Sequence, residues 1–504
     1  MDTTPLSTNW RTPLSYLVPS LAHCQVGFST ISISGFQAMT GFLSTYGHPD
    51  PSIPTGWNMG LIPQQLAASF VNLGTILGML LSKPTSLYLS RRHSLWLACI
   101  ISVIGSGLQL KHSAVAGLYA RRIIIGLSNG LFIAFSNAYT AETVPVESRE
   151  KVASLFTLWF CAGGVLGAVT NNFTKGLRTS WAYKIPLTCH ITIPSLLFIL
   201  VTFIPESPRW LLSHGRVDAA RCSLAVLRRC SASRDAVEKE MLELQIDVES
   251  QANTESQPWL RQYLEPWSPS HRRRTLLCTA LILTNSSSGI WLLLSYGTVF
   301  FQLARVPHPF HASIYNNLAN LLGTIVGLYL CTKTVMSRRM VMIAGCGVQA
   351  VCMLGIAITS TIMPTSSHTG VIVLVCVLVH GFSYFAFSAV LGSKLCGEVV
   401  DTRQTGRAVG MGTRLNYVTS WFIAFTMPYF INTRELNWGP KVAYMWAASN
   451  FVTGGFFWFC LPDTKACSQE QNEIETVIES RDSCMERITA GNHRKSLDGH
   501  QATC

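Results

Sequence analysis

Charged side chains are scarce in this chain. Asp, Glu, Lys and Arg make up 13% of its 504 residues, whereas 48% of the residues are hydrophobic. Soluble globular domains carry roughly 25% charged residues. So low a share cannot cover the surface of several water-soluble domains. The composition therefore indicates that lipid, rather than water, is the main solvent of this protein.

Several functional signatures are also missing. The N-terminus has no basic stretch followed by a short apolar core, so we expect no cleavable signal peptide. The 16 cysteines lie mostly inside apolar stretches, without the spacing of a disulfide framework or of a zinc site. No Ser/His/Asp set or phosphate-binding loop occurs in a suitable context. We therefore expect no enzymatic activity, no metal site and no cofactor.

What the chain does contain is a series of apolar segments, each near the length of about 20 residues that spans a bilayer. We predict an all-α integral membrane protein with twelve transmembrane helices. They lie at 21–43, 62–82, 94–110, 117–140, 151–171, 185–204, 275–301, 313–332, 340–362, 370–393, 408–431 and 442–461. The first and the eleventh are the least apolar. The first is rich in Ser, Thr and Gly, which suits a helix that faces a polar cavity.

The helices fall into two sets of six. The triplet Ser-Arg-Arg follows both the second and the eighth span, and a glutamate follows both the fourth and the tenth. Such a repeat predicts two pseudo-symmetric bundles with a substrate site between them. The expected parts are a cytoplasmic N-terminus (1–20), a first bundle (21–204), a cytoplasmic helical linker (205–274), a second bundle (275–461) and a cytoplasmic tail (462–504). Within the linker, 219–229 and 236–248 are predicted as short amphipathic helices.

The net charge of +12 is explained by the orientation of the chain in the membrane. With the N-terminus inside, most of the 38 Lys and Arg residues fall on the cytoplasmic side, as the positive-inside rule requires. We therefore expect a lipid bilayer as the partner, and no nucleic acid. The protein should be a multi-pass membrane protein, with the plasma membrane as its expected location. The sequon at 172–174 makes Asn172 a candidate glycosylation site in an outer loop, with a chance sequon as the equal alternative.

Several motifs occur in a fixed order. Residues 205–211 read PESPRWL, and Arg122 with Gly126 forms an RxxxG pattern in the fourth span. Residues 139–149 fit YxxExxPxxxR, and residues 181–186 read WAYKIP. Together these motifs resemble the sugar porter family of the major facilitator superfamily, in its fungal type, across about residues 20–470. The resemblance implies a transporter that moves a small-molecule substrate by alternating access.

The resemblance also implies an inner gate. Arg and Glu side chains at the cytoplasmic helix ends would pair across the two bundles when that side is closed, and would separate when it opens. Helix-end charges that only set topology are the alternative. The gate candidates are Arg91, Arg92, Glu142, Arg149, Glu206, Arg209, Arg338, Arg339 and Glu398.

Substrate-binding positions are carried over from the family one at a time. The implied substrate-binding residues are His190, Asn285, Ser286, Trp291, Asn416, Tyr417 and Ser420. Relative to the family pattern, long amides are replaced by shorter polar groups, and Trp291 stands where a small amide is usual. This favours a larger or less hydroxylated solute than an ordinary hexose. Each residue could instead serve packing. Three amides in or near the eighth span, Asn316, Asn317 and Asn320, are not oriented by the sequence.

Proton-coupled members of the family carry an Asp in the first helix. Here Ser29 occupies that position, and no Asp or Glu occurs between Asp2 and Asp50. The leading hypothesis is therefore a facilitative transporter of a sugar or a related small organic solute. The alternatives are a transporter of a specialised metabolite, a proton-coupled symporter in which His190 titrates, and a transporter-like nutrient sensor. The short cytoplasmic tail disfavours the sensor.

Overall fold

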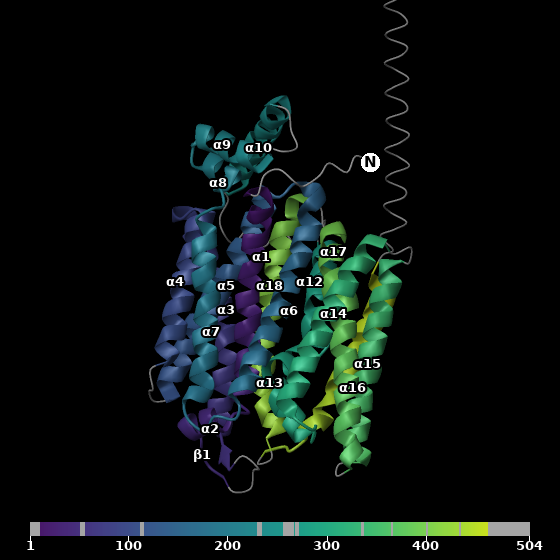
Figure 1. The fold of residues 1–504 in the computed structure, drawn as a ribbon. Helices are drawn as coiled ribbons and strands as arrows, with labels where there is room; N and C mark the ends of the chain where they lie inside the picture. The colour runs from purple at the N-terminus through teal and green to yellow at the C-terminus, as the bar shows by residue number, and fades with distance from the viewer. Residues whose placement is uncertain are drawn as a thin grey trace, which may run out of the picture.

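The computed structural model is a bundle of long helices (Figure 1). It describes residues 11–50, 56–110, 115–228, 234–255, 267, 272–333, 337–363, 366–399, 402–432 and 435–461. The predicted tail at 462–504 lies outside the described residues. The first six spans are α1 (Arg11–Phe36), α3 (Leu61–Tyr88), α4 (Arg91–Leu110), α5 (Val115–Thr143), α6 (Val146–Thr174) and α7 (Trp181–Val201).

The second half repeats this arrangement with two interruptions. Its spans are α12 (Arg272–Ser287) with α13 (Ile290–Leu303), α14 (Pro309–Lys333), α15 (Arg338–Ile362), α16 (Ser367–Ser383) with the π-helical turn η2 (Tyr384–Ala389) and α17 (Val390–Val399), α18 (Thr402–Ile431), and α19 (Ala443–Cys460) after the short 3-10 turn η3 (Gly439–Val442). Figure 1 shows the two halves side by side, which confirms the all-α membrane architecture.

Nine of the spans within the described residues are long and apolar enough to cross a membrane by length and composition alone. The three that fall short of this measure are α1, α18 and α19. The sequence identifies α1 and α18 as the least apolar spans. Serines explain α1: Ser15, Ser20, Ser29, Ser32 and Ser34 are all buried. These hydroxyls turn away from lipid, so their polarity does not oppose insertion of the helix in its folded setting.

The first span differs from its predicted bounds of 21–43. Helix α1 begins at Arg11, well before the predicted start, and ends at Phe36. A short helix, α2 (Thr40–Tyr46), follows. It leads into a hairpin of two antiparallel strands of two residues each, β1 (His48–Pro49) and β2 (Trp57–Asn58). This hairpin lies at the opposite end of the molecule from the linker helices (Figure 1). We call these ends the hairpin end and the linker end.

The linker forms a small helical layer at the linker end (Figure 1). It consists of α8 (Pro208–Ser213), α9 (Val217–Arg228) and α10 (Arg234–Glu255). Ser207 caps α8 by accepting a hydrogen bond from the Trp210 amide, as N-cap serines do. Buried Leu211, Leu224 and Met241 form its own hydrophobic core. The two short amphipathic helices predicted in this segment correspond to α9 and α10.

Glycines set the distance between α3 and α5. A Cβ atom added at Gly126 would lie 2.1 Å from the carbonyl oxygen of Val71, and one added at Gly74 would lie 2.9 Å from the Gly126 Cα. Small residues let membrane helices approach until their backbones touch. The glycine of the RxxxG motif therefore serves helix packing in the first half.

We predict that Gly126→Ala destabilises the protein by about 2–3 kcal/mol, because the added methyl group overpacks a backbone contact. Gly107→Ala is the matched control: Gly107 also lies in a helix, but a Cβ there meets nothing within 4 Å. That control should be neutral or stabilise by up to about 1 kcal/mol. Thermal unfolding of both variants in detergent measures the difference. Equal unfolding temperatures would contradict the packing argument.

Candidate functional site

The seventh span is broken between α12 and α13. Gly289 has a φ of 82°, a backbone conformation that favours glycine. A Cβ at this position would also lie 2.7 Å from the ring of Trp446. The break leaves the carbonyl of Ser288 outside the regular helical pattern. Two buried side chains satisfy it: His380 Nε2 lies 2.9 Å from this oxygen and Asn450 Nδ2 lies 3.2 Å from it.

The predicted polar residues of the seventh and eleventh spans meet beside this break. Ser286 Oγ donates to Asn416 Oδ1 at 3.0 Å and lies 2.6 Å from the hydroxyl of Thr419. Asn285 is half-buried and makes no side-chain hydrogen bond within the described part of the chain. Ser420 is buried, and its hydroxyl has no hydrogen-bond partner there either. In this cluster, Ser286 and Asn416 are hydrogen-bonded to each other, and the neighbouring Asn285 and Ser420 side chains remain available to bind a solute.

An aromatic pair adjoins this cluster. Trp291 and Tyr417 form an edge-to-face contact with their ring centroids 5.6 Å apart. The indole nitrogen of Trp291 is buried without a hydrogen-bond partner among the described residues. Tyr417 packs against one hydrophobic cluster made mainly of second-half residues and against another made of first-half residues. The aromatic pair therefore lies where the two halves meet, which is the place expected for a substrate.

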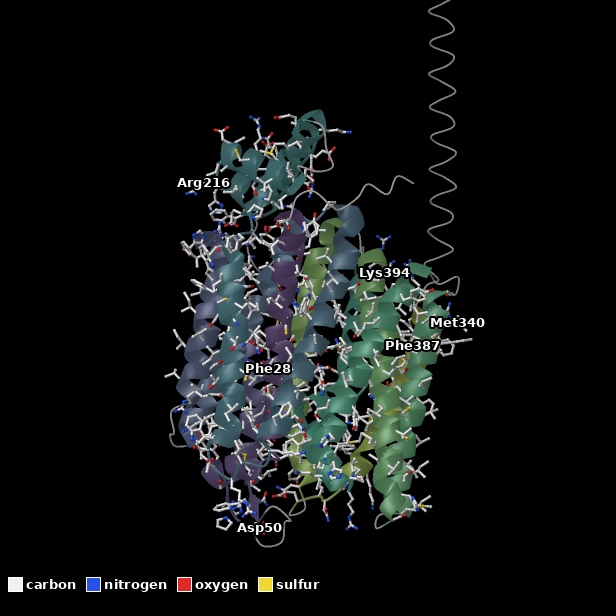
Figure 2. All side chains as sticks on the ribbon, in the orientation of Figure 1. Phe28, Asp50, Arg216, Met340, Phe387 and Lys394 are labelled. Carbon is white, nitrogen blue, oxygen red and sulfur yellow. The ribbon has the colours of Figure 1, made fainter. Side chains whose placement is uncertain are left out.

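His190 is not part of this cluster. It lies on α7, where its ring nitrogens lie 2.7 Å from Gln25 Nε2 and 2.7 Å from the hydroxyl of Ser106. Its ring also packs against Phe28, at a centroid distance of 5.5 Å. Phe28 belongs to α1, and Figure 2 shows it within the first half. These contacts of His190 all lie within the first half, so a substrate site that it shares with the seventh- and eleventh-span residues stays a prediction.

The sequence analysis did not identify Gln25 as part of a polar network. Its amide also donates to Ser102 Oγ at 2.9 Å. The signal was present, because Ser102 and Ser106 are spaced four residues apart in an apolar helix, which places them on one face. A single helix does not reveal which neighbour that face meets, so the network appears only in the folded chain.

The structure shows which neighbouring helices the three amide side chains of α14 contact. Asn316, Asn317 and Asn320 are all buried. A Cβ added at Gly164 of α6 would lie 2.8 Å from Asn317 Oδ1, so this amide reaches the first half. Asn320 and Asn316 instead lie against Gly381 of α16. Asn317 therefore joins the candidate site residues at the interface between the halves.

Four of the gate candidates form a cluster at the linker end of the first half. The Arg91 guanidinium contacts the Glu142 carboxylate, with Nη2 2.7 Å from Oε1. Ser207 Oγ donates to the same carboxylate at 2.6 Å. Glu206 accepts hydrogen bonds from the backbone amide of Arg92 and from the hydroxyl of Ser90. These contacts attach the PESPRWL segment to the ends of α4 and α5.

Two further gate candidates, Arg209 and Arg339, contact the linker and their own half. Arg209 lies 3.7 Å from Asp247 of α10. Arg339 donates to the Trp458 carbonyl of α19 and lies over its ring. Arg338 begins α15, and the side chains of Arg149 and Glu398 lie outside the described residues. None of the ion pairs between described residues joins the two halves, so an inter-bundle gate made by these charges stays a prediction.

Hydrogen bonds join the two halves near the hairpin end. The backbone amide of Thr298 donates to Ser34 Oγ at 3.0 Å. Gln37 Nε2 donates to the Ser295 carbonyl at 3.5 Å, and Gln302 Nε2 donates to the Ala38 carbonyl at 3.4 Å. These three contacts join the end of α1 to α13.

The predicted glycosylation sequon is helical. Asn172 lies in the last turn of α6 (Val146–Thr174) and not in a loop, which corrects that part of the prediction. Its side-chain oxygen accepts a hydrogen bond from Lys175 Nζ at 2.7 Å. Whether Asn172 carries a glycan stays a prediction.

We expect Gly289→Ala to abolish or strongly reduce transport, because a methyl group there clashes with Trp446 and strains a left-handed backbone by about 1–2 kcal/mol. Gly297→Ala on the same span is the matched control, since its nearest neighbour is Ser34 Oγ at 3.8 Å. Solute uptake per folded molecule in proteoliposomes checks the pair. Full activity of Gly289→Ala would show that the break is dispensable.

Curated relatives of the chain include fungal transporters. It is 27% identical over 464 residues to the probable glucose transporter rco-3 of Neurospora crassa, covering 88% of this chain and 76% of that protein. It is 25% identical over 496 residues to the major facilitator-type transporter ecdD of Aspergillus rugulosus, covering 94% and 89%. The low-affinity glucose transporter HXT1 of Saccharomyces cerevisiae is 24% identical, covering 88% and 78%.

Solved structures show the same fold. The proton:xylose symporter XylE bound to 6-bromo-6-deoxy-D-glucose superposes with a TM-score of 0.71 at 19% identity, covering 90% of this chain and 96% of that one. A partially occluded inward-open conformation of the xylose transporter XylE from E. coli also gives a TM-score of 0.71, at 18% identity, covering 90% and 100%. The profile of the sugar (and other) transporter family matches residues 16–475. The chain belongs to the sugar transporter family of the major facilitator superfamily and is a membrane transporter.

Proposed function

We propose that this transporter carries a sugar or a related small organic solute by facilitated diffusion. The observation that carries the proposal is the cluster of α12 and α18 at the interface of the halves. Ser286 and Asn416 provide neutral hydrogen-bonding groups, and Trp291 with Tyr417 provides a flat apolar surface beside them. A hydroxylated solute needs both kinds of contact: neutral groups to replace water and an apolar face for its C–H surface. We also propose the plasma membrane as its location.

The proposal that transport is not coupled to protons rests on the side chains of the first helix, α1. Ser29 Oγ donates to the Val26 carbonyl at 3.0 Å and accepts from Asn129 Nδ2 at 2.8 Å. Both contacts are neutral, and neither partner titrates in the physiological range. The first carboxylate after this helix, Asp50, lies at the hairpin end (Figure 2). Without a carboxylate on α1, movement of the solute down its own gradient is the mechanism that these residues support.

A second candidate is a transporter of a specialised metabolite. The aromatic pair and the short polar groups favour a solute with fewer hydroxyls than a hexose. The similarity to the major facilitator-type transporter ecdD, over 94% of this chain, supports keeping this candidate. Both candidates use the same site, and they differ in the solute that competes best for it.

We expect uptake to be saturable and unaffected by a proton uncoupler, because α1 carries no carboxylate to couple it. The test expresses the chain in cells that lack their own hexose porters and offers a panel of labelled sugars and metabolites. Abolition of uptake by the uncoupler would favour a symporter. A changed signalling response with no solute movement would favour the sensor.

We predict that Asn416→Ala raises KM about tenfold with little change in kcat, since a hydrogen bond lost from the site costs about 1.4 kcal/mol. Thr426→Ala is the control, because the hydroxyl of this half-buried α18 residue donates to carbonyls of its own helix, at Phe422 and Ile423. Initial uptake rates over a range of solute concentrations separate the two parameters. An unchanged KM in Asn416→Ala would remove this residue from the site.

A further inference from the structure

A small cavity lies inside the first half, between α1, α5 and α7. Its volume is about 10 Å³, which is enough for a single water-sized group. Most of its wall is apolar, but four polar side chains reach it: Ser29, Ser32, Arg122 and His190. The Trp291–Tyr417 pair of the candidate substrate site does not line this cavity.

Arg122 is the notable member of this wall. Its side chain is buried, with 2% of the residue exposed. Its Nε has no hydrogen-bond partner, and no residue of the described part of the chain forms an ion pair with it. Its guanidinium carbon lies 5.7 Å from the centroid of the Phe36 ring, and it also interacts electrostatically with Tyr46, a neutral phenol. An arginine stays charged in proteins, and an uncompensated buried charge costs several kcal/mol.

The surrounding polar groups do not supply the missing negative charge. Ser29 and Ser32 donate their hydroxyl protons to carbonyls of their own helix, at Val26 and Phe28. His190 is engaged by Gln25 and Ser106.

No acidic residue on the three helices around the cavity is available either. Helices α1 and α7 contain no Asp or Glu. The one carboxylate of α5, Glu142, is held by Arg91. The cavity thus presents one fixed positive charge, and none of the three helices supplies a free negative one.

We propose that this cavity binds a small monovalent anion against the Arg122 guanidinium. The ligand is a singly charged anionic group about the size of a water molecule. Either a chloride ion or one oxygen of a solute carboxylate could supply it. The two serines and His190 surround the anion with polar groups. This site goes beyond the transport function and does not depend on which neutral solute the protein carries.

The test measures the thermal unfolding of the full chain in lipid nanodiscs as sodium chloride replaces sodium isethionate at constant ionic strength, because the sulfonate group is larger than chloride and should bind more weakly. Chloride should raise the Tm of the wild-type protein saturably by about 2–3 °C, because it binds the folded state alone. Arg122→Gln should abolish this dependence. Equal Tm values for the wild type in the two salts, measured up to molar concentration, would rule out chloride as the anion. If glucuronate then also had no effect on the Tm, the proposal would be overturned.

A charge restored on α1 gives an independent test. Ser29→Asp places a carboxylate in the wall of the cavity, where it should pair with Arg122, displace the anion and make the Tm independent of chloride. Ser29→Asn is the matched control, with nearly the same shape and no charge, and it should keep the chloride dependence. Because this test retains the arginine, it stands even if Arg122→Gln does not fold. Chloride dependence that persists in Ser29→Asp would contradict the site.

The source of the anion is resolved with solutes in place of salt. If a solute carboxylate fills the cavity, glucuronate should compete with chloride for the stabilisation of the wild type, whereas glucose should leave the chloride dependence unchanged. If a free halide fills it, chloride alone should act. Uptake of neutral sugars, measured in both salts, keeps the two proposals separate. If no anion changes the Tm but uptake is normal, the anion site is refuted and the transport function is unaffected.

Discussion

A carbonyl group freed from its helix inside a membrane has no water to accept from, so the protein itself must supply a donor. The break in the seventh span depends on this requirement. The Ser288 carbonyl is held by His380 of the tenth span and Asn450 of the twelfth. These donors fix the direction of α13, and α13 in turn makes the hydrogen bonds that join the two halves at the hairpin end. The helix break, its two donors and the hydrogen bonds from α13 to the first half are therefore linked through α13.

The opposite end is organised differently. Its charges pair within the first half and with the linker: Arg91 with Glu142, and Arg209 with Asp247. The ion pairs between described residues at this end stay within the first half and the linker. Hydrogen bonds do join the halves, both near the hairpin end, from Thr298 to Ser34, and between α6 and α14, where Cys161 lies 3.3 Å from Thr324.

The replacement of a carboxylate by Ser29 affects two parts of the first half. On α1 it removes the titratable group and leaves a hydroxyl that bonds to Val26 and Asn129. Across the cavity, Arg122 forms no ion pair with any residue in the described part of the chain. The loss was visible in the sequence. Its consequence for Arg122 was not, because the distance between two helices is a property of the folded bundle.

The sequence by itself determined the number of spans, their division into two halves, the helical linker, the family and the absence of a carboxylate on the first helix. These features follow from composition and local pattern. Only the tertiary structure decided which polar atoms meet. Successive residues of a helix are rotated by about 100°, so a small turn of one helix changes every partner. That is why Ser286 and Asn416 came together as expected while His190 turned into the first half, and why the role of His380 could not be predicted.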